Sequence, residues 1–301
     1  MKHAFLIMAH SNFPLLSRLL KKIDHINNMI YIHIDAKSTF STQDMELLKN
    51  SCQFSTITFI ERYKITWGSY SQINLELRLL EAALADNCDY YHFLSGNDFL
   101  IQNMKSFHQF FEKHSGYEFV NFSSENFLKS ITDRFTYYHF FRCIYGRNRK
   151  NIFYWFDRAS IYFQKRIFHT NRTTQYPKLE YRCGANWCSI THEFSKHLLS
   201  QEALIKKMFK HTTCADEVFL QTILYNSPFM ERVYGKCCKI TGSDACLRSI
   251  DWSRPGELEF SPHVYTCHDY EELIHSNNFI CRKVTDQTPD GEALIQKLEL
   301  L

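Results

Sequence analysis

The hydrophobic pattern at the start of the chain predicts a strand, a helix and a second strand. Residues His3–Ala9 form a nearly continuous apolar run, which is typical of a strand buried on both faces. Asn12 and Pro14 suit the cap and first turn of a helix, and the leucines that follow recur at helical spacing. Residues Met29–Asp35 alternate isoleucine with other side chains and end in a carboxylate. Such a unit predicts a parallel sheet whose ligands bind beyond the carboxyl ends of its strands.

Similar patterns predict further strands and helices along the chain. We expect strands at Thr56–Glu61, Tyr90–Leu94 and Asn186–Ile190, and helices at Tyr70–Ala85, near Asp216–Leu224 and from about Gly291 onward. No internal repeat or linker-like run of Pro, Gly and Ser divides the sequence. We therefore predict an α/β fold, with a mostly parallel central sheet flanked by helices, in a single domain over residues 1–301 whose halves are 1–122 and 123–301.

Composition excludes several broad classes of protein. The chain is 45% hydrophobic, which argues against disorder, and its net charge of +3 is too small to suggest nucleic-acid binding. No run approaches the roughly eighteen apolar residues of a membrane span, and the run Ala4–Ala9 is too short for a secretory leader. We therefore expect a cytoplasmic protein.

One segment departs from this balance of charge. Residues 142–178 carry nine basic side chains and one acid, Asp157, interleaved with aromatic residues. A solvated surface face is the ordinary interpretation of such a segment. The alternative is peripheral docking on the anionic inner face of the cell membrane, where a lipid-linked acceptor would reside. Nucleic-acid binding is a weaker third interpretation, because the segment matches no recognisable nucleic-acid module.

The sequence lacks the common motifs of several enzyme classes. It contains no G-x-G-x-x-G, P-loop, G-x-S-x-G, H-E-x-x-H or C-x-x-C. These absences weaken the interpretations as a dinucleotide-binding protein, a kinase-type enzyme, a serine hydrolase or a zinc protein. No two aspartates are separated by one residue, so there is no D-x-D to hold a metal on a nucleotide diphosphate. Arg or Lys would have to neutralise such a diphosphate, and we expect no metal and no other cofactor.

Short motifs in a fixed order cover nearly the whole chain. They read AFLIMAHSN and YIHIDAKS near the start, ITWGSYS ahead of LSGNDF (Leu94–Phe99), then GANWCSITHEF (Gly184–Phe194), ADEVFLQTIL (Ala215–Leu224), LRSIDWSR (Leu247–Arg254) and NNFICRKVTD (Asn277–Asp286). In this order they resemble the core-2/I-branching β-1,6-N-acetylglucosaminyltransferase and peptide-O-xylosyltransferase family, and the chain looks like a bacterial-type member.

The resemblance implies a GT-A-like glycosyltransferase fold and an inverting, metal-independent transfer from a UDP-sugar to a glycan acceptor. N-acetylglucosamine is the first choice of donor sugar, and xylosyl, glucosyl or galactosyl transfer on the same scaffold is the alternative. Residues 1–122 are then the half that binds the donor nucleotide, and residues 123–301 bind the acceptor and carry the catalytic base. An alternative from another class is a non-catalytic protein that binds a sugar nucleotide or a glycan.

The resemblance also implies roles for single residues. Glu217 occupies the position of the catalytic base, and Arg248 and Lys283 match the basic residues that grip the donor diphosphate. Asp35 resembles the family's uridine-contacting aspartate, and Trp67 stands where an aromatic residue flanks the uracil ring. The sequence leaves simpler interpretations open, because Asp35 also suits a strand-end turn and Trp67 also suits the core.

Three further residues are candidates for the donor and acceptor pocket, namely Gly96, Asp98 and Trp187. Gly96 would supply an unusual backbone angle or a close approach to the donor. Asp98 would contact the sugar or else organise its own turn through hydrogen bonds. Next to Lys283, Arg282 is a second cation able to share or compete for the phosphate role.

The predicted base has a physical argument of its own. An inverting transfer needs one carboxylate to take the proton of the acceptor hydroxyl. We expect Glu217 at a helix start, with Thr213 or Asp216 as the cap, because a helix N-terminus favours an ionised carboxylate. The simpler interpretation is a first-turn acid that only stabilises its helix.

Overall fold

The computed structural model describes residues 1–256 and 261–301, and a five-stranded sheet with the order β3-β2-β1-β4-β6 forms its centre. The strands are β1 (His3–Ala9), β2 (Asn28–Ile34), β3 (Thr56–Phe59), β4 (Tyr90–Ser95) and β6 (Ser189–Thr191). The first four strands are parallel, and β6 runs antiparallel to β4. The predicted α/β architecture with a mostly parallel central sheet is confirmed, and it is the arrangement that a GT-A-like fold requires.

A second, three-stranded sheet joins segments far apart in the sequence. Its order is β5-β8-β7, with β5 (Asp98–Leu100) antiparallel to β8 (Ile280–Arg282) and β7 (Arg248–Ile250) parallel to it. Strand β5 of the predicted first half pairs with β8 of the second half, and β6 of the second half pairs with β4 of the first half. Both sheets are therefore shared between the segments 1–122 and 123–301.

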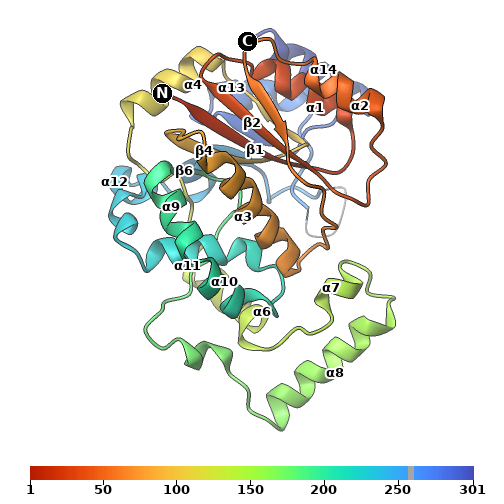
Figure 1. Ribbon diagram of the computed structural model, residues 1–301, viewed down its shortest axis with the longest axis vertical. Coiled ribbons are helices and arrows are strands. Elements are labelled where there is room, and N and C mark those ends of the chain that lie inside the picture. Colours follow the sequence, from red (N-terminus) through yellow and green to blue (C-terminus); the bar gives the residue numbers. More distant parts are fainter. Residues whose placement is uncertain (257–260) are drawn as a thin grey trace.

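Helices cover both faces of the central sheet (Figure 1). One face carries α1 (Phe13–Lys22), α4 (Met104–Lys113), α13 (Tyr270–His275) and α14 (Pro289–Glu299), and the other carries α3 (Tyr70–Leu84), α9 (His192–Ser200), α10 (Glu202–Phe209) and α11 (Phe219–Tyr225). Strand β1 shows the cause. Its alternate residues Phe5 and Ile7 belong to one hydrophobic cluster, while Ala4 and Leu6 belong to the other. The continuous apolar run predicted a strand buried on both faces, and this prediction is confirmed.

Most predicted elements lie within a few residues of the observed ones, and one differs in a way that matters. The helix expected near Asp216–Leu224 is divided, because Ala215–Glu217 form a short 3₁₀ turn and α11 begins at Phe219. The last helix begins at Pro289 rather than Gly291, since Thr288 caps it and proline suits its first turn. Other short helices among the described residues are α2 (Thr42–Lys49), α5 (Glu125–Ser130), α6 (Asp133–Thr136) and α12 (Tyr234–Cys238).

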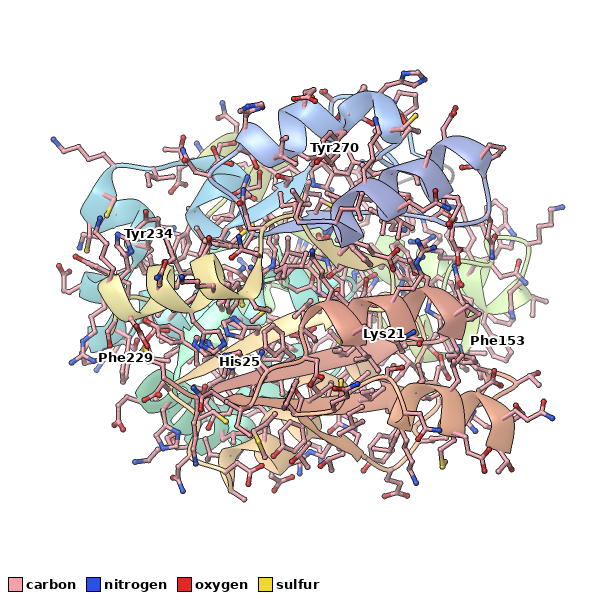
Figure 2. All side chains as sticks on the ribbon, turned by 90° about the horizontal axis from the view of Figure 1, so that it is seen from above. Lys21, His25, Phe153, Phe229, Tyr234 and Tyr270 are labelled. Atoms are coloured by element: carbon pink, nitrogen blue, oxygen red, sulfur yellow. The ribbon has the colours of Figure 1, made fainter. Side chains whose placement is uncertain are left out.

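Two helices of the basic segment lie at the end of the molecule away from both chain ends (Figure 1). They are α7 (Arg142–Tyr145) and α8 (Ile152–Arg166). In the view from above, Phe153 of α8 and Phe229 lie on opposite sides of the molecule (Figure 2). Among the helices of residues 1–256 and 261–301, none combines the length and the apolar character needed to cross a membrane.

Candidate functional site

The carboxyl ends of the parallel strands meet at one edge of the central sheet. After β1 the chain continues into His10, after β2 into Asp35 and after β4 into Gly96. Backbone hydrogen bonds hold these ends together, because Asp35 N–H donates to Ala9 O (2.9 Å) and Gly96 N–H donates to Met8 O (3.1 Å). Ligands of parallel α/β sheets bind at such an edge. Asp35 therefore lies at the strand-end edge, as its place after β2 predicted.

Asp35 organises the loop that follows β2. Its Oδ1 accepts hydrogen bonds from the backbone N–H groups of Lys37 (2.9 Å) and Ile65 (3.4 Å), and the Lys37 ammonium lies 3.7 Å from its other oxygen. These contacts are those of a strand-end turn residue. The carboxylate is still partly exposed, with 13% of the side chain accessible. Its contact with uridine stays a prediction.

Asp98 lies beneath the edge rather than on it. Its side chain is fully buried and accepts hydrogen bonds from Ser95 N–H (2.9 Å), Ser95 Oγ (2.8 Å) and the Arg282 guanidinium (2.6 Å). The structure thus contradicts a direct pocket contact for Asp98 and favours the alternative, an organiser of the turn and of Arg282. For Gly96 the predicted unusual backbone angle is wrong, because its φ is not positive, whereas its close approach to the donor stays a prediction. A Cβ at this position would lie 3.2 Å from the Ala9 side chain. The glycine permits two strand ends to pack closely.

Arg282 was predicted only as a second cation beside Lys283, after Arg248 and Lys283. It ends β8, forms the ion pair with Asp98 and also contacts the Ser95 hydroxyl. Its guanidinium lies 4.0 Å from the centre of the Trp187 ring, which supplies a cation–π contact. The predicted place of Trp187 in the donor and acceptor pocket stays a prediction. The side chain keeps 14% of its surface exposed. In the sequence, the position of Arg282 directly before Lys283 was the signal that pointed to it as a candidate phosphate contact.

The structure disfavours Arg248 as a phosphate-binding residue. Only 1% of it is exposed, and its guanidinium donates to Cys246 O (2.9 Å), Cys188 O (3.2 Å) and Ser189 Oγ (3.1 Å). Burial lowers the pKa of Arg248, which shows that its charge has lost much of its contact with water. A side chain that is enclosed in this way ties β7 to the start of β6 and has no surface to offer a diphosphate.

Lys283 remains near the strand-end edge. Its ammonium donates to Ser261 Oγ at 3.2 Å, and the side chain is half-buried. Lys283 and Arg282 both act electrostatically on His10, and so does Asp35. His10 is therefore a member of this group that sequence reasoning missed, although its place directly after β1 is the same signal that selected Asp35.

Trp67 lies in the loop before α3 and outside both hydrophobic clusters of the described chain. Two guanidinium groups contact its ring, Arg142 at 4.8 Å and Arg147 at 4.3 Å from the ring centre. The adjacent Gly68 has φ +70°, and a Cβ there would overlap the Arg142 guanidinium. Gly68 O accepts from Cys214 N–H (2.8 Å), which brings the Trp67 loop next to the segment of Glu217. Trp67 therefore packs against two arginine side chains and is not part of the hydrophobic core of the described residues.

Glu217 is half-exposed at the end of the 3₁₀ turn that precedes α11. Neither Thr213 nor Asp216 caps this turn, and no side-chain hydrogen bond caps it at Cys214 either, so the predicted stabilisation by a helix start is wrong. The Arg134 guanidinium instead forms an ion pair with its Oε2 at 2.7 Å. Arg134 is 83 residues away in sequence, and the sequence offered no signal for the contact. The ion pair holds the Glu217 carboxylate in place.

A buried carboxyl pair lies behind Glu217. Burial and the neighbouring Glu217 charge raise the pKa of Asp216, and burial raises the pKa of Glu76. Gln72 donates to Asp216 at 3.2 Å, and Asn186 donates to Glu76 at 3.3 Å. Glu76 and Asp216 therefore favour their neutral forms, whereas the half-exposed Glu217 is paired with Arg134.

One loop connects the two parts of the site. Gly184 N–H donates to Glu217 O (2.9 Å), and three residues later Trp187 packs on Arg282. Gly184 also passes so close to Asn121 O that no Cβ would fit between them. The structure thus links Glu217, Trp187 and Arg282 through the segment 184–187, with Lys283 next in the chain after Arg282.

A group of potential metal ligands occurs elsewhere. In residues 1–256 and 261–301 the side chains of Cys267, His268 and Asp290 lie within 4.8 Å of one another, and two of the three are exposed. None of them is a predicted site residue.

Comparison with known proteins gives the family. The model described as "Branch: Core-2/I-Branching enzyme" matches residues 3–276. Xylosyltransferase sqv-6 of Caenorhabditis briggsae is 23% identical over 292 residues, 92% of this chain and 34% of its own length. Xylosyltransferase 2 of Rattus norvegicus is 21% identical over 285 residues, 87% of this chain and 30% of its own length. The chain thus spans about a third of the length of these curated relatives.

A solved structure is also similar. The apo form of mouse xyloside xylosyltransferase 1 superposes with a TM-score of 0.39 at 10% identity, over 95% of this chain and 99% of that one. At this level the superposition adds nothing to the family assignment, which the family model carries alone. The family indicated by the ordered motifs is confirmed: the chain belongs to the Core-2/I-Branching enzyme family.

Proposed function

We propose that the chain is a glycosyltransferase that moves a sugar from a UDP donor to a hydroxyl of a glycan, with inversion and without a metal. The family and the relatives named xylosyltransferases support the reaction class. The observation that carries the proposal is the link through residues 184–187 between a half-exposed carboxylate, Glu217, and a cation on an aromatic ring, Arg282 on Trp187.

In this proposal Glu217 is the general base. Its carboxylate takes the proton from the acceptor hydroxyl as that oxygen attacks the anomeric carbon, and the bond to UDP breaks on the opposite face. Arg134 holds the carboxylate ready in the absence of acceptor and must move aside from one oxygen when the acceptor hydroxyl approaches. Glu217 is the better choice because its side chain is half-exposed and paired with Arg134, whereas the neighbouring Asp216 is buried.

Arg282 and Lys283 are the proposed contacts of the departing diphosphate. Cations aimed at the position where negative charge develops stabilise the transition state, as a divalent ion does in other transferases. The absence of a D-x-D in the sequence agrees with this assignment. Arg282 takes the place first given to Arg248, because it is the partly exposed member of the two.

The donor sugar is the least defined part of the proposal. N-acetylglucosamine follows from the sequence resemblance, and xylose follows from the names of the relatives. Asp35 and Trp67 are the proposed contacts of the uridine, which every UDP-sugar shares. The acceptor is a glycan, and the structure distinguishes no linkage.

The test is release of UDP by purified protein from UDP-N-acetylglucosamine, UDP-xylose, UDP-glucose and UDP-galactose, with and without EDTA and candidate glycans. We expect turnover that EDTA does not reduce. Strong dependence on added manganese would contradict the metal-free step. Donor binding by thermal shift without turnover in any mixture would establish the alternative, a non-catalytic binding protein.

Glu217→Gln gives the largest effect on turnover. We expect a loss of about 10²–10⁴-fold in kcat, because the amide cannot accept the proton. The donor KM and the thermal midpoint should stay close to those of the wild type. Glu125→Gln is the matched control, since Glu125 also faces an arginine, Arg182, at 3.5 Å and is exposed. Equal turnover in Glu217→Gln and the wild type would refute the role of Glu217.

A further inference from the structure

The helix α8 packs with its polar side chains inward. Its two buried residues are Asp157 and Gln164. Asp157 accepts hydrogen bonds from His139 Nδ1 (3.1 Å), Phe141 N–H (3.2 Å) and Tyr145 Oη (3.1 Å). The only acid of the segment 142–178 is therefore enclosed and committed to contacts within the protein.

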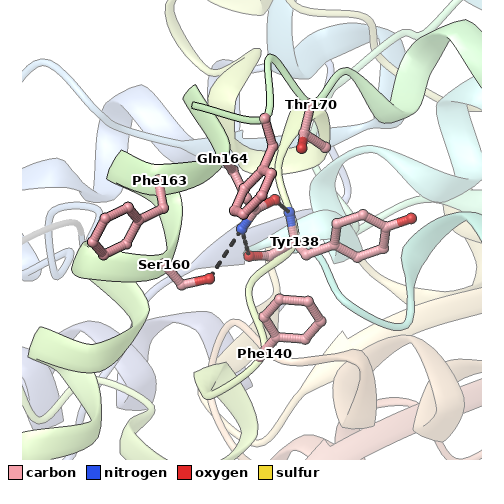
Figure 3. Close-up of a pocket in the computed structure, with 7 residues that line it drawn as sticks. Tyr138, Phe140, Ser160, Phe163, Gln164 and Thr170 are labelled. Atoms are coloured by element: carbon pink, nitrogen blue, oxygen red, sulfur yellow. Dashed lines mark hydrogen bonds between the residues drawn. The ribbon is translucent and has the colours of Figure 1, made fainter. Parts of the chain in front are cut away.

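Gln164 anchors the other end of the helix (Figure 3). Its side-chain oxygen accepts from Tyr138 N–H (2.7 Å), and its amide nitrogen donates to Tyr138 O (2.9 Å) and to Ser160 Oγ (3.2 Å). The helix is thus attached to the preceding chain by the polar contacts of Asp157 and Gln164, together with ring contacts of Phe153 with Phe141 and of Tyr154 with Tyr145. Most of its large apolar side chains take no part in this attachment, whereas an ordinary surface helix of a globular protein buries its apolar stripe.

Large apolar side chains occupy the opposite side of α8. Within the helix they repeat at intervals of three, four and seven residues, which places them on one stripe, and Ile167 and Phe168 follow directly after its end. Their exposed fractions are high, for example 64% for Trp155, 61% for Tyr162 and 71% for Phe168. The members of this apolar stripe are Ile152, Trp155, Phe156, Tyr162, Phe163, Ile167 and Phe168. A contiguous exposed set of this kind marks an interaction surface.

A cavity continues the apolar stripe toward the body of the molecule (Figure 3). Its volume is about 520 Å³, and its lining consists mainly of aromatic rings. The lining residues are Tyr138, Phe140, Ser160, Phe163, Gln164, Phe168 and Thr170. Two of them, Phe163 and Phe168, belong to the stripe as well, so the surface and the cavity form one apolar region.

The exposed charges within the segment 142–178 have one sign, and the nearby Asp133 carboxylate lies 3.8 Å from the Lys165 ammonium. The exposed basic residues of the segment are Arg147, Arg149, Lys150, Arg158, Lys165, Arg166 and Lys178. Since the single acid of the segment is buried, its exposed charges are all positive. Long basic side chains beside a stripe of Trp, Tyr and Phe suit an interface between a bilayer and water, where the rings enter the headgroup region and the cations reach phosphates.

We propose that α8 docks on an anionic lipid bilayer, with the apolar stripe in the headgroup region and the flanking Lys and Arg side chains on lipid phosphates. A nucleic acid would use the cations but would leave the apolar side chains in water. A second copy of the chain would cover the stripe but would bring the cations close to their own copies. The bilayer is the partner that satisfies both features.

Contacts of residues 134–140 connect the region of α8 with the segment of the proposed base. Arg134, which pairs with Glu217, precedes Tyr138 and Phe140 of the cavity by a few residues. His139 N–H donates to His211 O (2.8 Å), and Thr213 N–H donates to Arg134 O (3.1 Å). If the proposed function holds, a glycan anchored in the same bilayer would be presented toward Glu217. The lipid contact itself does not depend on that function.

Flotation with vesicles tests the docking. We expect the protein to float with phosphatidylcholine vesicles that contain phosphatidylglycerol, and to remain unbound with phosphatidylcholine alone. Trp155→Ala/Phe156→Ala should weaken binding about tenfold or more, because two large apolar groups no longer leave water. Arg158→Ala/Arg166→Ala should also weaken it about tenfold, and added salt should reduce binding of the wild type.

The matched control is Ile26→Ala/Phe54→Ala, which removes two apolar side chains that are 71% and 60% exposed outside the segment 142–178. It should bind as the wild type does, and all variants should keep the wild-type thermal midpoint. Equal binding of the α8 variant and the control variant would overturn the proposal. So would equal flotation with neutral vesicles, or self-association of the wild type in sedimentation velocity that Trp155→Ala/Phe156→Ala abolishes.

Tryptophan fluorescence provides an independent measurement. The emission should shift to shorter wavelength when anionic vesicles are added, since Trp155 leaves water. Trp155→Phe should float as the wild type does but should lose this shift. Trp252→Phe is the control, because Trp252 is 60% exposed and lies outside the segment. A shift that survives in Trp155→Phe and disappears in Trp252→Phe would overturn the placement.

Discussion

The edge of the central sheet and the region of α8 bury different kinds of polar group and expose different surfaces. At the edge, Asp98 is enclosed together with Arg248, and Arg282 covers it. In α8, Asp157 and Gln164 are enclosed, and aromatic rings face outward. Regular strands hold the first arrangement in register, whereas a few side-chain hydrogen bonds hold the second.

The difference separates two tasks. A network of buried charges keeps its geometry only when each member is present, because a lone charge in the interior is costly. It therefore suits the positioning of groups such as Arg282 at the edge. A helix such as α8, attached through one side, can present its other side to a lipid bilayer. The packing of the central sheet does not depend on that exposed side.

The largest effect is expected for the edge. Asp98→Ala should lower the free energy of unfolding by about 3–5 kcal/mol, because the Arg282 charge then has no buried partner. Urea unfolding followed by circular dichroism measures the change. Asp133→Ala, which removes an exposed carboxylate 3.8 Å from Lys165, should cost less than about 1 kcal/mol. Similar costs for both variants would mean that the buried pair contributes little.

A smaller and more local effect is expected in α8. Asp157→Ala removes the acceptor for His139, Phe141 and Tyr145, which should cost about 1–3 kcal/mol. The change should appear as faster proteolysis within residues 142–168, while the unfolding of the rest of the chain stays cooperative. Unchanged cleavage in that segment would show that α8 is held by something other than Asp157.

The smallest effect concerns pH and again separates the two regions. Under the sheet, burial is the main cause that lowers the pKa of His3 and His92 well below 6.5, and it lowers the pKa of His108 to about 4. His3 Nδ1 and His92 Nε2 lie 2.9 Å apart, and His92 Nδ1 lies 2.7 Å from Ser189 Oγ. These rings stay neutral in the folded protein at a pH where the unfolded chain is already protonated.

The unfolded state therefore binds more protons below about pH 6.5, and stability falls as the pH decreases. His92→Asn should reduce this slope by about 1.4 kcal/mol per pH unit between pH 6 and 5. Burial raises the pKa of Glu118 to about 7, and that opposite contribution cancels when variant and wild type are compared. His169→Asn, at an exposed position beyond α8, should leave the slope unchanged. An unchanged slope in His92→Asn would refute the role of His92.

The parts of the molecule that sequence predicted well are those with a local cause. Continuous apolar runs identified β1 and β4, and the end of β2 identified Asp35 as a residue at the ligand edge. In each case the neighbours in sequence decide the structure, so the pattern was sufficient.

The errors came from contacts between distant segments. Nothing near Arg248 in the sequence shows that Cys188 and Ser189 enclose its guanidinium, and its motif suggested an exposed cation. The partner of Glu217 is Arg134, from a segment that the motifs did not cover. The composition of the segment 142–178 was evident, but which of its side chains face inward depends on Tyr138 and His139, outside that segment.

The close passage of Gly184 and Asn121 sets a limit on how far the site can be remodelled. The Gly184 N–H donates to the backbone oxygen of Glu217, the proposed base. On its other side the Asn121 backbone oxygen leaves no room for a methyl group on residue 184. Alanine at this position would have to displace one of the two chains by a distance comparable to a bond length. An engineer who wishes to change the acceptor should therefore vary residues around Trp187 and keep position 184 as the fixed spacer.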